Sequence, residues 1–255
     1  MRFATFNILH GRTVTDGIVD LDRLRAAIRA IDADVLAMQE VDCDQPRSDL
    51  ADLTAVAAEA MGAVSHRFVA ALSGTPGATW IAATGREQPG TAAYGIALLS
   101  RYPVTSWRVV RLPVLRSRVP VWFRGDRRPK VVSDEPRVAV AAVIEGPAGP
   151  MTVATTHLSF VPGWNVVQLR RLVRALAGTR EPMVLTGDLN LEPRQVARVS
   201  GLRGIATAPT FPADVPTRQL DHVHVRGPLA AVGPAESVRL PLSDHRALVV
   251  AVEPA

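Results

Sequence analysis

Two short motifs bring together the residue types that hydrolytic chemistry requires. Gly187-Asp188-Leu189-Asn190 follows the apolar run Met183–Thr186, and Ser243-Asp244-His245 lies next to a second apolar run at 246–252. Because side chains alternate along an extended strand, we expect Asp188 and Asn190 to point to the same side. Burying a carboxylate, a carboxamide or an Asp–His pair is costly unless the group holds a cation or a reacting molecule. The two motifs therefore predict one hydrolytic site.

Further polar residues lie at the ends of strand-like runs. They are Asn7, Glu40, His157 and Asp221. We add these four residues to the predicted site, because burying polar side chains at the ends of strands is costly unless they bind a cation or a reacting group.

Three nearby residues have simpler interpretations. His222 adjoins Asp221 and should face away from it, since neighbouring side chains on a strand alternate. His10 is expected in a loop, and Tyr94 is expected to contribute packing.

Two other kinds of site do not fit the pattern. The side chains of Ser243, Asp244 and His245 cannot converge as a serine-hydrolase triad requires, because adjacent residues on a strand alternate faces. A structural zinc site is disfavoured, since Cys43 is the only cysteine and the histidines lack ligand spacing.

Hydrophobic periodicity predicts the elements that position these residues. Apolar residues at helical spacing indicate three helices, over 20–31, 50–61 and 165–178. Alternating or apolar runs indicate strands at 1–9, 34–40, 67–71, 79–83, 95–99, 104–112, 137–145, 151–157, 183–187, 221–226 and 246–252. Such a mixture of helices and strands allows a doubly wound sheet as well as a sandwich.

Composition limits the cellular setting. The 255 residues contain no repeat or linker, so we expect a single domain over 1–255. The single cysteine favours the reducing cytoplasm, and we find no signal-peptide pattern and no apolar run of the length that spans a bilayer. The net charge of +5 comes almost wholly from arginine, since Lys130 is the only lysine. It is compatible with an ordinary solvated surface or with a polyanion partner.

The longest irregular stretch runs from Pro113 to Pro136. It contains the basic residues Arg116, Arg118, Arg124, Arg127, Arg128 and Lys130 around the pair Trp122-Phe123. Long loops in compact domains are often functional, although a solvated surface loop would have the same composition.

Seven motifs in order resemble the endonuclease/exonuclease/phosphatase superfamily, also called deoxyribonuclease I-like. They are Thr5-Phe6-Asn7, Gln39-Glu40, Gly95–Ser100, Thr155-Thr156-His157-Leu158, Gly187–Asn190, Leu220–Val223 and Ser243-Asp244-His245. Each motif alone is weak, but together they extend over nearly the whole chain. The resemblance implies an α/β four-layer sandwich, in which two mainly antiparallel β-sheets pack face to face with helices on the outside.

The resemblance also implies a Mg²⁺-dependent (or Mn²⁺-dependent) hydrolase of phosphate esters. On this basis Glu40 is the best metal ligand, Asn7 lies beside it as a ligand or orienter, and Asp244 has a metal-side role. Asp188 would align or deprotonate the attacking water, and Asn190 would hold water or phosphate.

The remaining site residues would contact or support the phosphate group. His245 would donate a hydrogen bond to a non-bridging oxygen, and Asp221 would fix its tautomer. His157 matches a second phosphate contact, and Arg137 would support the site.

The substrate remains open at this point. Leu9 stands where abasic-site endonucleases of the superfamily carry an acid, and His222 stands where they carry tyrosine, so a dedicated DNA-repair enzyme is disfavoured. Three hypotheses remain: hydrolysis of a small-molecule or lipid head-group phosphate, a nuclease with little sequence preference for DNA or RNA, and an inactive binding module. No obligate protein partner is evident.

Overall fold

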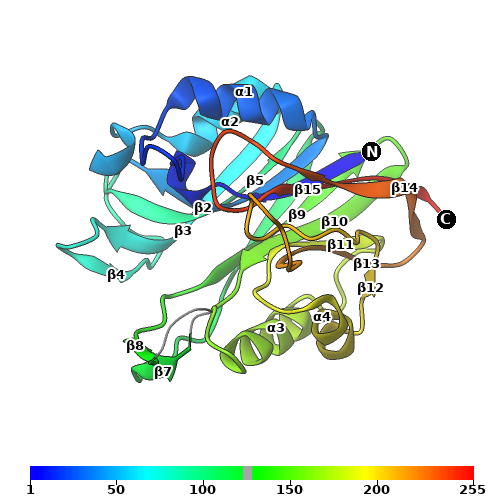
Figure 1. Cartoon of the computed structure of the whole chain (residues 1–255). Coiled ribbons are helices and arrows are strands. Elements are labelled where there is room, and N and C mark those ends of the chain that lie inside the picture. The colour runs from blue at the N-terminus through cyan, green and yellow to red at the C-terminus, as the bar shows by residue number, and fades with distance from the viewer. Residues whose placement is uncertain (123–127) are drawn as a thin grey trace.

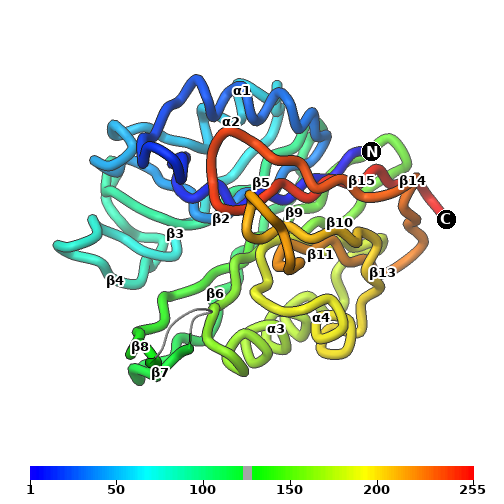
Figure 2. The backbone as a smooth tube through the Cα atoms, in the orientation of Figure 1, coloured from blue at the N-terminus to red at the C-terminus, as the bar shows by residue number. Residues whose placement is uncertain are grey.

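Two β-sheets pack face to face, with helices on both outer surfaces, in the computed structural model, which describes residues 1–122 and 128–255 (Figures 1 and 2). Figure 1 shows α1 and α2 above the first sheet and α3 and α4 below the second. This arrangement confirms the four-layer sandwich and excludes the doubly wound sheet.

The first sheet has seven strands and places the first strand of the chain near its centre. Its order is β14 (Leu229–Val238), β15 (Ala247–Pro254), β1 (Arg2–Asn7), β2 (Val35–Cys43), β5 (Ala93–Ser100), β3 (Ser65–Gly74) and β4 (Trp80–Ala82). Only β1 and β2 run parallel; the other neighbours are antiparallel.

The second sheet has six strands and the same mixed character. Its order is β12 (Arg203–Gly204), β13 (Asp221–Arg226), β11 (Met183–Asp188), β10 (Gly149–His157), β9 (Val138–Gly146) and β6 (Val104–Arg111). Here β10 and β11 form the one parallel pair.

Three hydrophobic clusters hold the layers together. One lies between the sheets and includes Phe3, Val35, Val153 and Val184. A second joins the first sheet to its helices, and a third joins the second sheet to its helices. Burial of these apolar side chains from water on both faces of both sheets is the main favourable contribution to folding.

In the described part of the chain four α-helices cover the sheets. One short 3₁₀ turn precedes α1, and another follows β2. These elements are α1 (Leu21–Ile31), α2 (Leu53–Met61), α3 (Trp164–Ala175) and α4 (Pro193–Ser200), with η1 (Leu9–Gly11) and η2 (Pro46–Ser48). The side chains of Asp20 and Asp52 accept backbone N–H groups at the starts of α1 and α2.

Several boundaries differ from the sequence prediction. The second helix begins at Leu53 rather than at residue 50, because Asp52 caps it and Asp49 and Leu50 adopt left-handed backbone conformations. Helix α4 and strand β14 were not predicted, since α4 is a short, mostly polar helix and β14 contains glycine and proline.

The stretch from Pro113 to Pro136 is less irregular than predicted. It contains a small hairpin formed by β7 (Val119–Val121) and β8 (Lys130–Val132). Trp122 is exposed, as are Arg116, Arg118 and Arg128. Phe123, Arg124 and Arg127 lie outside the described residues.

Among the helices of the described residues, none combines the length and the apolar character needed to cross a membrane.

Gly187 allows β10 and β11 to approach closely just before Asp188. Its φ is +134°, and a Cβ atom there would lie 2.0 Å from the carbonyl oxygen of Thr156. Gly187→Ala should therefore lower the free energy of unfolding by about 3 kcal/mol or more, since backbone must move. Urea denaturation measures this change.

The matched control is Gly201→Ala, at the end of α4. Gly201 also has a positive φ, but a Cβ atom there would meet nothing within 4 Å. That variant should lose only about 1 kcal/mol. Equal losses at the two positions would contradict the steric argument.

Candidate active site

The candidate site lies where the central strands of both sheets end. In the first sheet β1 and β2 run parallel and pair Asn7 with Gln39, and in the second β10 and β11 run parallel and pair His157 with Asp188. Strands β1 and β11 contact each other across the sandwich. The carboxyl ends of four strands therefore meet at one opening between the sheets.

Side chains become more polar along each strand toward this opening. Every second residue faces the other sheet, so Phe3 on β1 is followed by Thr5 and Asn7. Beneath the site, the Thr5 hydroxyl donates to Gln39 Oε1 (3.2 Å), and Gln39 Nε2 donates to Thr155 Oγ1 (3.3 Å). A buried layer of neutral polar groups thus separates the apolar core from the charged site.

A β-bulge directs Glu40 toward the site. The pairing of β2 with β5 shifts between Gln39 and Val41, and Glu40 adopts a left-handed backbone with φ +56°. Regular alternation would have pointed Glu40 to the outer face with Leu36 and Met38. A non-glycine residue in this conformation costs roughly 1 to 3 kcal/mol, a cost that clusters at functional sites.

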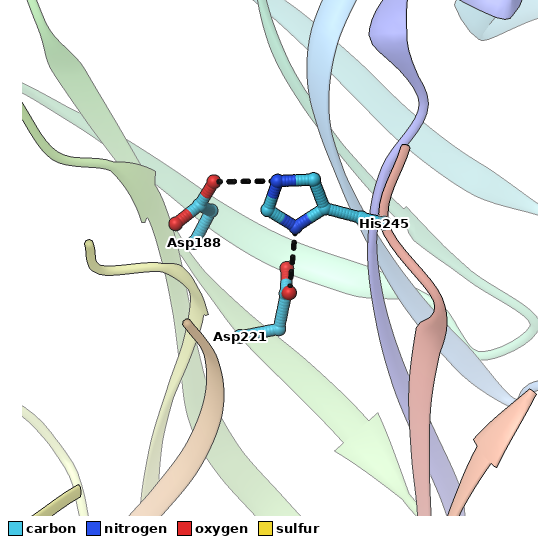
Figure 3. Close-up of side chains that lie close together, drawn as sticks. All are labelled: Asp188, Asp221 and His245. Carbon is cyan, nitrogen blue, oxygen red and sulfur yellow. Dashed lines mark hydrogen bonds and ion pairs between the residues drawn. The ribbon is translucent and has the colours of Figure 1, made fainter. Parts of the chain in front are cut away.

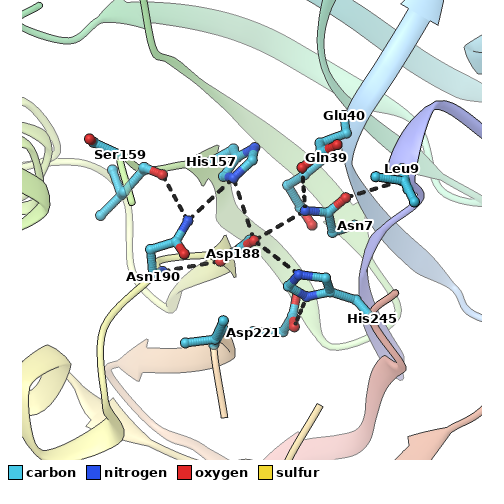
Figure 4. A network of polar contacts seen from close by, with 12 residues as sticks. Asn7, Leu9, Gln39, Glu40, His157, Ser159, Asp188, Asn190, Asp221 and His245 are labelled. Carbon is cyan, nitrogen blue, oxygen red and sulfur yellow. Dashed lines mark hydrogen bonds and ion pairs between the residues drawn. The ribbon is translucent and has the colours of Figure 1, made fainter. Parts of the chain in front are cut away.

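Asn7 connects the carboxylates of the two sheets (Figure 4). Its Nδ2 donates to Glu40 Oε1 (3.0 Å) and to Asp188 Oδ2 (3.1 Å), while its Oδ1 accepts the backbone N–H of Leu9 (3.1 Å). Burial raises the pKa of Glu40, and the hydrogen bond from Asn7 opposes that rise. With its oxygen already engaged, Asn7 is placed to orient the two carboxylates.

Asp188 and Asn190 do lie together, but not for the reason that the sequence indicated. Strand β11 ends at Asp188, and Asn190 has a left-handed backbone with φ +49°. The backbone N–H of Asn190 donates to Asp188 Oδ1 (3.1 Å), and Asn190 Nδ2 donates to the carbonyl of Leu158 (3.0 Å). Asp188 and Asn190 are therefore brought together by a turn that the Asp188 side chain closes, and not by strand alternation.

Asp221 and His245 form a buried pair beside Asp188 (Figure 3). His245 Nδ1 lies 2.9 Å from Asp221 Oδ2, and His245 Nε2 lies 3.8 Å from Asp188 Oδ2. Burial alone would lower the pKa of His245, but the carboxylate of Asp221 outweighs it and raises the pKa to about 10. Burial raises the pKa of Asp188 to about 7, although the positive charge of His245 acts to lower it.

His157 is held in a different electrostatic environment. Its Nδ1 lies 3.0 Å from Arg137 Nη1, and its Nε2 lies 3.4 Å from Asp188 Oδ2. Burial, reinforced by the neighbouring guanidinium of Arg137, lowers the pKa of His157 well below its ordinary value. Because the arginine can only donate, Nδ1 is the acceptor and the single proton of the neutral ring is on Nε2.

The other predicted residues are distributed as follows. Asp244 lies close enough for its charge to raise the pKa of both Glu40 and His245. His222 faces away from the site, with Nε2 2.8 Å from the carbonyl of Leu191. His10 lies in η1, and Tyr94 lines the cavity described below.

Three contacts that hold the site were not predicted. Thr210 donates to Asp221 Oδ2 (2.6 Å), Ser243 donates to the carbonyl of Asn7 (2.6 Å), and the ring of Phe211 lies 4.9 Å from that of His245. Thr210 and Phe211 lie in a connection without recognisable periodicity, so no sequence pattern indicated them. Ser243 lies in the Ser243-Asp244-His245 motif, which by itself indicates no role for the serine.

The opening is a cavity of about 540 Å³. Both sheets and the segment after β8 line it, through Asn7, Glu40, Tyr94, Val132, Ser133, Glu135, Arg137, His157, Phe160, Asp188, Asn190 and His245. Most of the residues predicted for the site therefore line one cavity, whereas Asp221 and Asp244 are not among its lining residues.

The carboxylates suit a divalent cation. Asp188, Asp221 and His245 offer ligand atoms within 4.8 Å of one another and could hold a metal. The Oδ1 atom of Asp244 is buried without a hydrogen-bond partner in the described part of the chain. Carboxylate oxygens are the ligands that hard cations such as Mg²⁺ and Mn²⁺ prefer.

Known proteins share this fold. A structure of an endonuclease/exonuclease/phosphatase from Beutenbergia cavernae matches with a TM-score of 0.74 and 24% identity, covering 100% of this chain and 72% of the other. The mannosyl-6-phosphatase of Bacteroides thetaiotaomicron matches with a TM-score of 0.65 and 15% identity over 99% of each chain. The catalytic domain of human Nocturnin with bound sulfate has a TM-score of 0.63 and 19% identity, covering 100% and 93%. No curated protein matches the sequence.

Family membership follows from the sequence itself. The profile of the Endonuclease/Exonuclease/phosphatase family matches residues 4–245, so the chain belongs to this family. The resemblance seen in the seven motifs is thereby confirmed, and the chain is placed among hydrolases of phosphate esters.

Asp221→Asn should lower the pKa of His245 from about 10 toward its ordinary value near 6.5, since the neutral amide no longer stabilises the imidazolium. The variant imidazole would then lose its proton between about pH 6 and 7 instead of staying charged through neutral pH. NMR titration of the histidine rings measures this directly. A His245 pKa that did not fall would contradict the assigned pairing.

Proposed function

We propose that this chain hydrolyses a phosphate ester of a small molecule or lipid head group, with Mg²⁺ as the required cation. The observation that carries the proposal is the cavity, whose volume of about 540 Å³ lies within the range of roughly 300 to 1,000 Å³ usual for small-molecule sites. Val132, Phe160 and the carboxylate of Glu135 in its wall suit a polar organic group better than a duplex.

The cation would be held by Glu40 with Asp244, on the side of the cavity nearest Asn7. In the Asp188–Asp221–His245 cluster, Asp221 and His245 are already hydrogen-bonded to each other. The Oδ1 atom of Asp244 has no such partner in the described part of the chain, so Glu40 and Asp244 are more available to a cation. When bound, the cation neutralises phosphoryl oxygens and the charge that develops on the leaving oxygen. Without such a charge, the carboxylates would repel an anionic substrate.

Asp188 is suited to hold the attacking water and accept its proton. Burial raises its pKa to about 7, which is near the optimum for a general base at neutral pH. The turn to Asn190 fixes one carboxylate oxygen and Asn7 fixes the other. The amide of Asn190, held against Leu158, would keep the water or a phosphate oxygen in place.

His245 is suited to stabilise charge on the phosphoryl group. Asp221 occupies its Nδ1 atom, so Nε2 carries the proton that faces the cavity. A positively charged donor there stabilises a non-bridging oxygen more strongly in the transition state than in the ground state.

His157 and Arg137 form a second donor group. Because Arg137 donates to Nδ1, the neutral ring of His157 presents its Nε2 proton toward the space above Asp188. This geometry suits a second contact to a phosphate oxygen, with Arg137 supporting the ring.

The fold resembles that of the mannosyl-6-phosphatase, which supports testing a sugar phosphate first as a substrate class. A cytoplasmic location remains a prediction from the cysteine content.

A nuclease remains the second candidate, because exposed arginines belong to a segment that lines part of the cavity. Arg116, Arg118 and Arg128 belong to the segment that supplies Val132, Ser133 and Glu135 to the cavity wall. Contacts from these side chains to a nucleic-acid backbone would make binding fall steeply with salt concentration.

Mg²⁺ should raise the melting temperature of the wild type, because a ligand that binds only the folded state stabilises it. Glu40→Gln should abolish that rise while keeping the fold, since the buried carboxylate is replaced by a neutral group of the same shape. Differential scanning fluorimetry with and without Mg²⁺ or Mn²⁺ measures both effects. Asp49→Asn, at an exposed carboxylate, is the matched control and should respond like the wild type.

The activity test compares three substrates with Mg²⁺ present: a sugar phosphate, p-nitrophenyl phosphate and supercoiled plasmid. Asp188→Asn should reduce hydrolysis by about 10² to 10⁴-fold, the usual contribution of general acid–base catalysis. Turnover of the small esters without plasmid nicking supports the proposal, whereas nicking alone favours the nuclease. Absence of any turnover would favour an inactive binding module.

A further inference from the structure

Tyr94 occupies the same structural position on β5 as the proposed site residues do on their strands. It lies two residues before Ile96 and four before Leu98, both of which face the core between the sheets. By strand alternation Tyr94 faces the same interior, at the end of β5 next to the opening. Asn7, His157 and Asp188 are likewise the outermost inward-facing residues of β1, β10 and β11.

The hydroxyl of Tyr94 is available to a ligand. The residue is only 8% exposed and lines the cavity, yet within the described residues its hydroxyl has no hydrogen-bond partner. Burial raises the pKa of Tyr94 well above its ordinary value, so the group stays a donor at every working pH.

Two neighbouring side chains contact the ring of Tyr94. The guanidinium carbon of Arg47 lies 5.5 Å from the ring centre, and Trp80 lies 5.6 Å from it. Arg47 is itself fixed by two hydrogen bonds to the fully buried carboxylate of Asp42, at 2.8 and 2.7 Å. An aromatic ring clamped in this way presents its hydroxyl at a defined point.

The charges around Tyr94 indicate what that hydroxyl binds. Tyr94 lines the same cavity as Glu40, Glu135 and Arg137, and the guanidinium of Arg47 lies beside its ring. On the proposed function, Glu40 holds the cation and Arg137 supports a phosphate contact. The phosphate would therefore occupy the space that Tyr94 faces.

We infer that Tyr94 is a substrate-binding residue whose hydroxyl donates a hydrogen bond to a phosphate oxygen, with Arg47 positioning its ring. The inference rests on the proposed function, because it assumes that a phosphate group binds between Glu40 and Arg137. The Tyr94 hydroxyl would then contact the phosphate from β5 of the first sheet, whereas His157 and Arg137 would contact it from the second sheet.

The test measures binding of inorganic phosphate in the presence of Mg²⁺ by isothermal titration calorimetry. Tyr94→Phe keeps the ring and removes only the hydroxyl, so it should raise the Kd for phosphate by about ten- to a hundredfold without lowering the melting temperature. Tyr102→Phe is the matched control, because the chain has two tyrosines and Tyr102 lies beyond the opposite end of β5. Its Kd should equal that of the wild type.

The role of Arg47 is tested by a double-mutant cycle. Arg47→Lys keeps the charge but loses the two-pronged contact to Asp42 that holds the guanidinium over the ring. It should weaken phosphate binding in the wild-type background and have little further effect when Tyr94→Phe is present. Equal effects in both backgrounds would overturn the assigned role of Arg47.

Three results would overturn the assignment of Tyr94 itself. They are an unchanged Kd in Tyr94→Phe, an equal loss in Tyr102→Phe, and the absence of phosphate binding by the wild type. Hydrolysis is measured separately on the same proteins. Turnover by the wild type with an unaltered phosphate Kd in Tyr94→Phe would leave the proposed function standing and remove only this inference.

Discussion

The gathering of four carboxylates between two apolar sheets is the constraint on which the rest of the site depends. Glu40, Asp188, Asp221 and Asp244 come from both sheets and lie near one another, although the chain as a whole carries a charge of +5. Like charges at low dielectric repel strongly, so each needs a compensating group. Asn7 donates to two of them and His245 lies between two. On the proposed function, a bound cation would complete the same balance.

Much of the fold and the site follows from the sequence, because both depend on period-two alternation. The runs ending at Asn7, His157 and Asp188 are apolar on the faces toward the core and the helices, so their last inward residues were identifiable as site candidates. The seven motifs then supplied the four-layer architecture, which alternation alone left open. The candidate residues meet at one opening because each central parallel pair brings two strand ends to the same edge.

The features that sequence reasoning missed are local departures from regular structure. Glu40 reaches the site only through a bulge, and Asn190 only through a turn, and neither leaves a periodic signal. Thr210 supports Asp221 from a connection with no pattern of its own. Helix α2 begins later than the apolar spacing indicated because a capping aspartate, rather than hydrophobicity, fixes its first residue. Such details depend on tertiary contacts that a single sequence does not display.

The pairing of β1 with β15 has a consequence for synthesis of the protein. Strand β1 lies between β2 and β15, and the amino group of Met1 donates to the carbonyl of Val252, 251 residues away. His245 lies two residues before β15, so a nascent chain on the ribosome lacks this residue of the cavity wall until residue 245 has been translated. Partial chains would leave an edge of β1 unpaired, which is a template for wrong association. Ribosomal stalling before residue 245 should therefore yield an aggregation-prone intermediate.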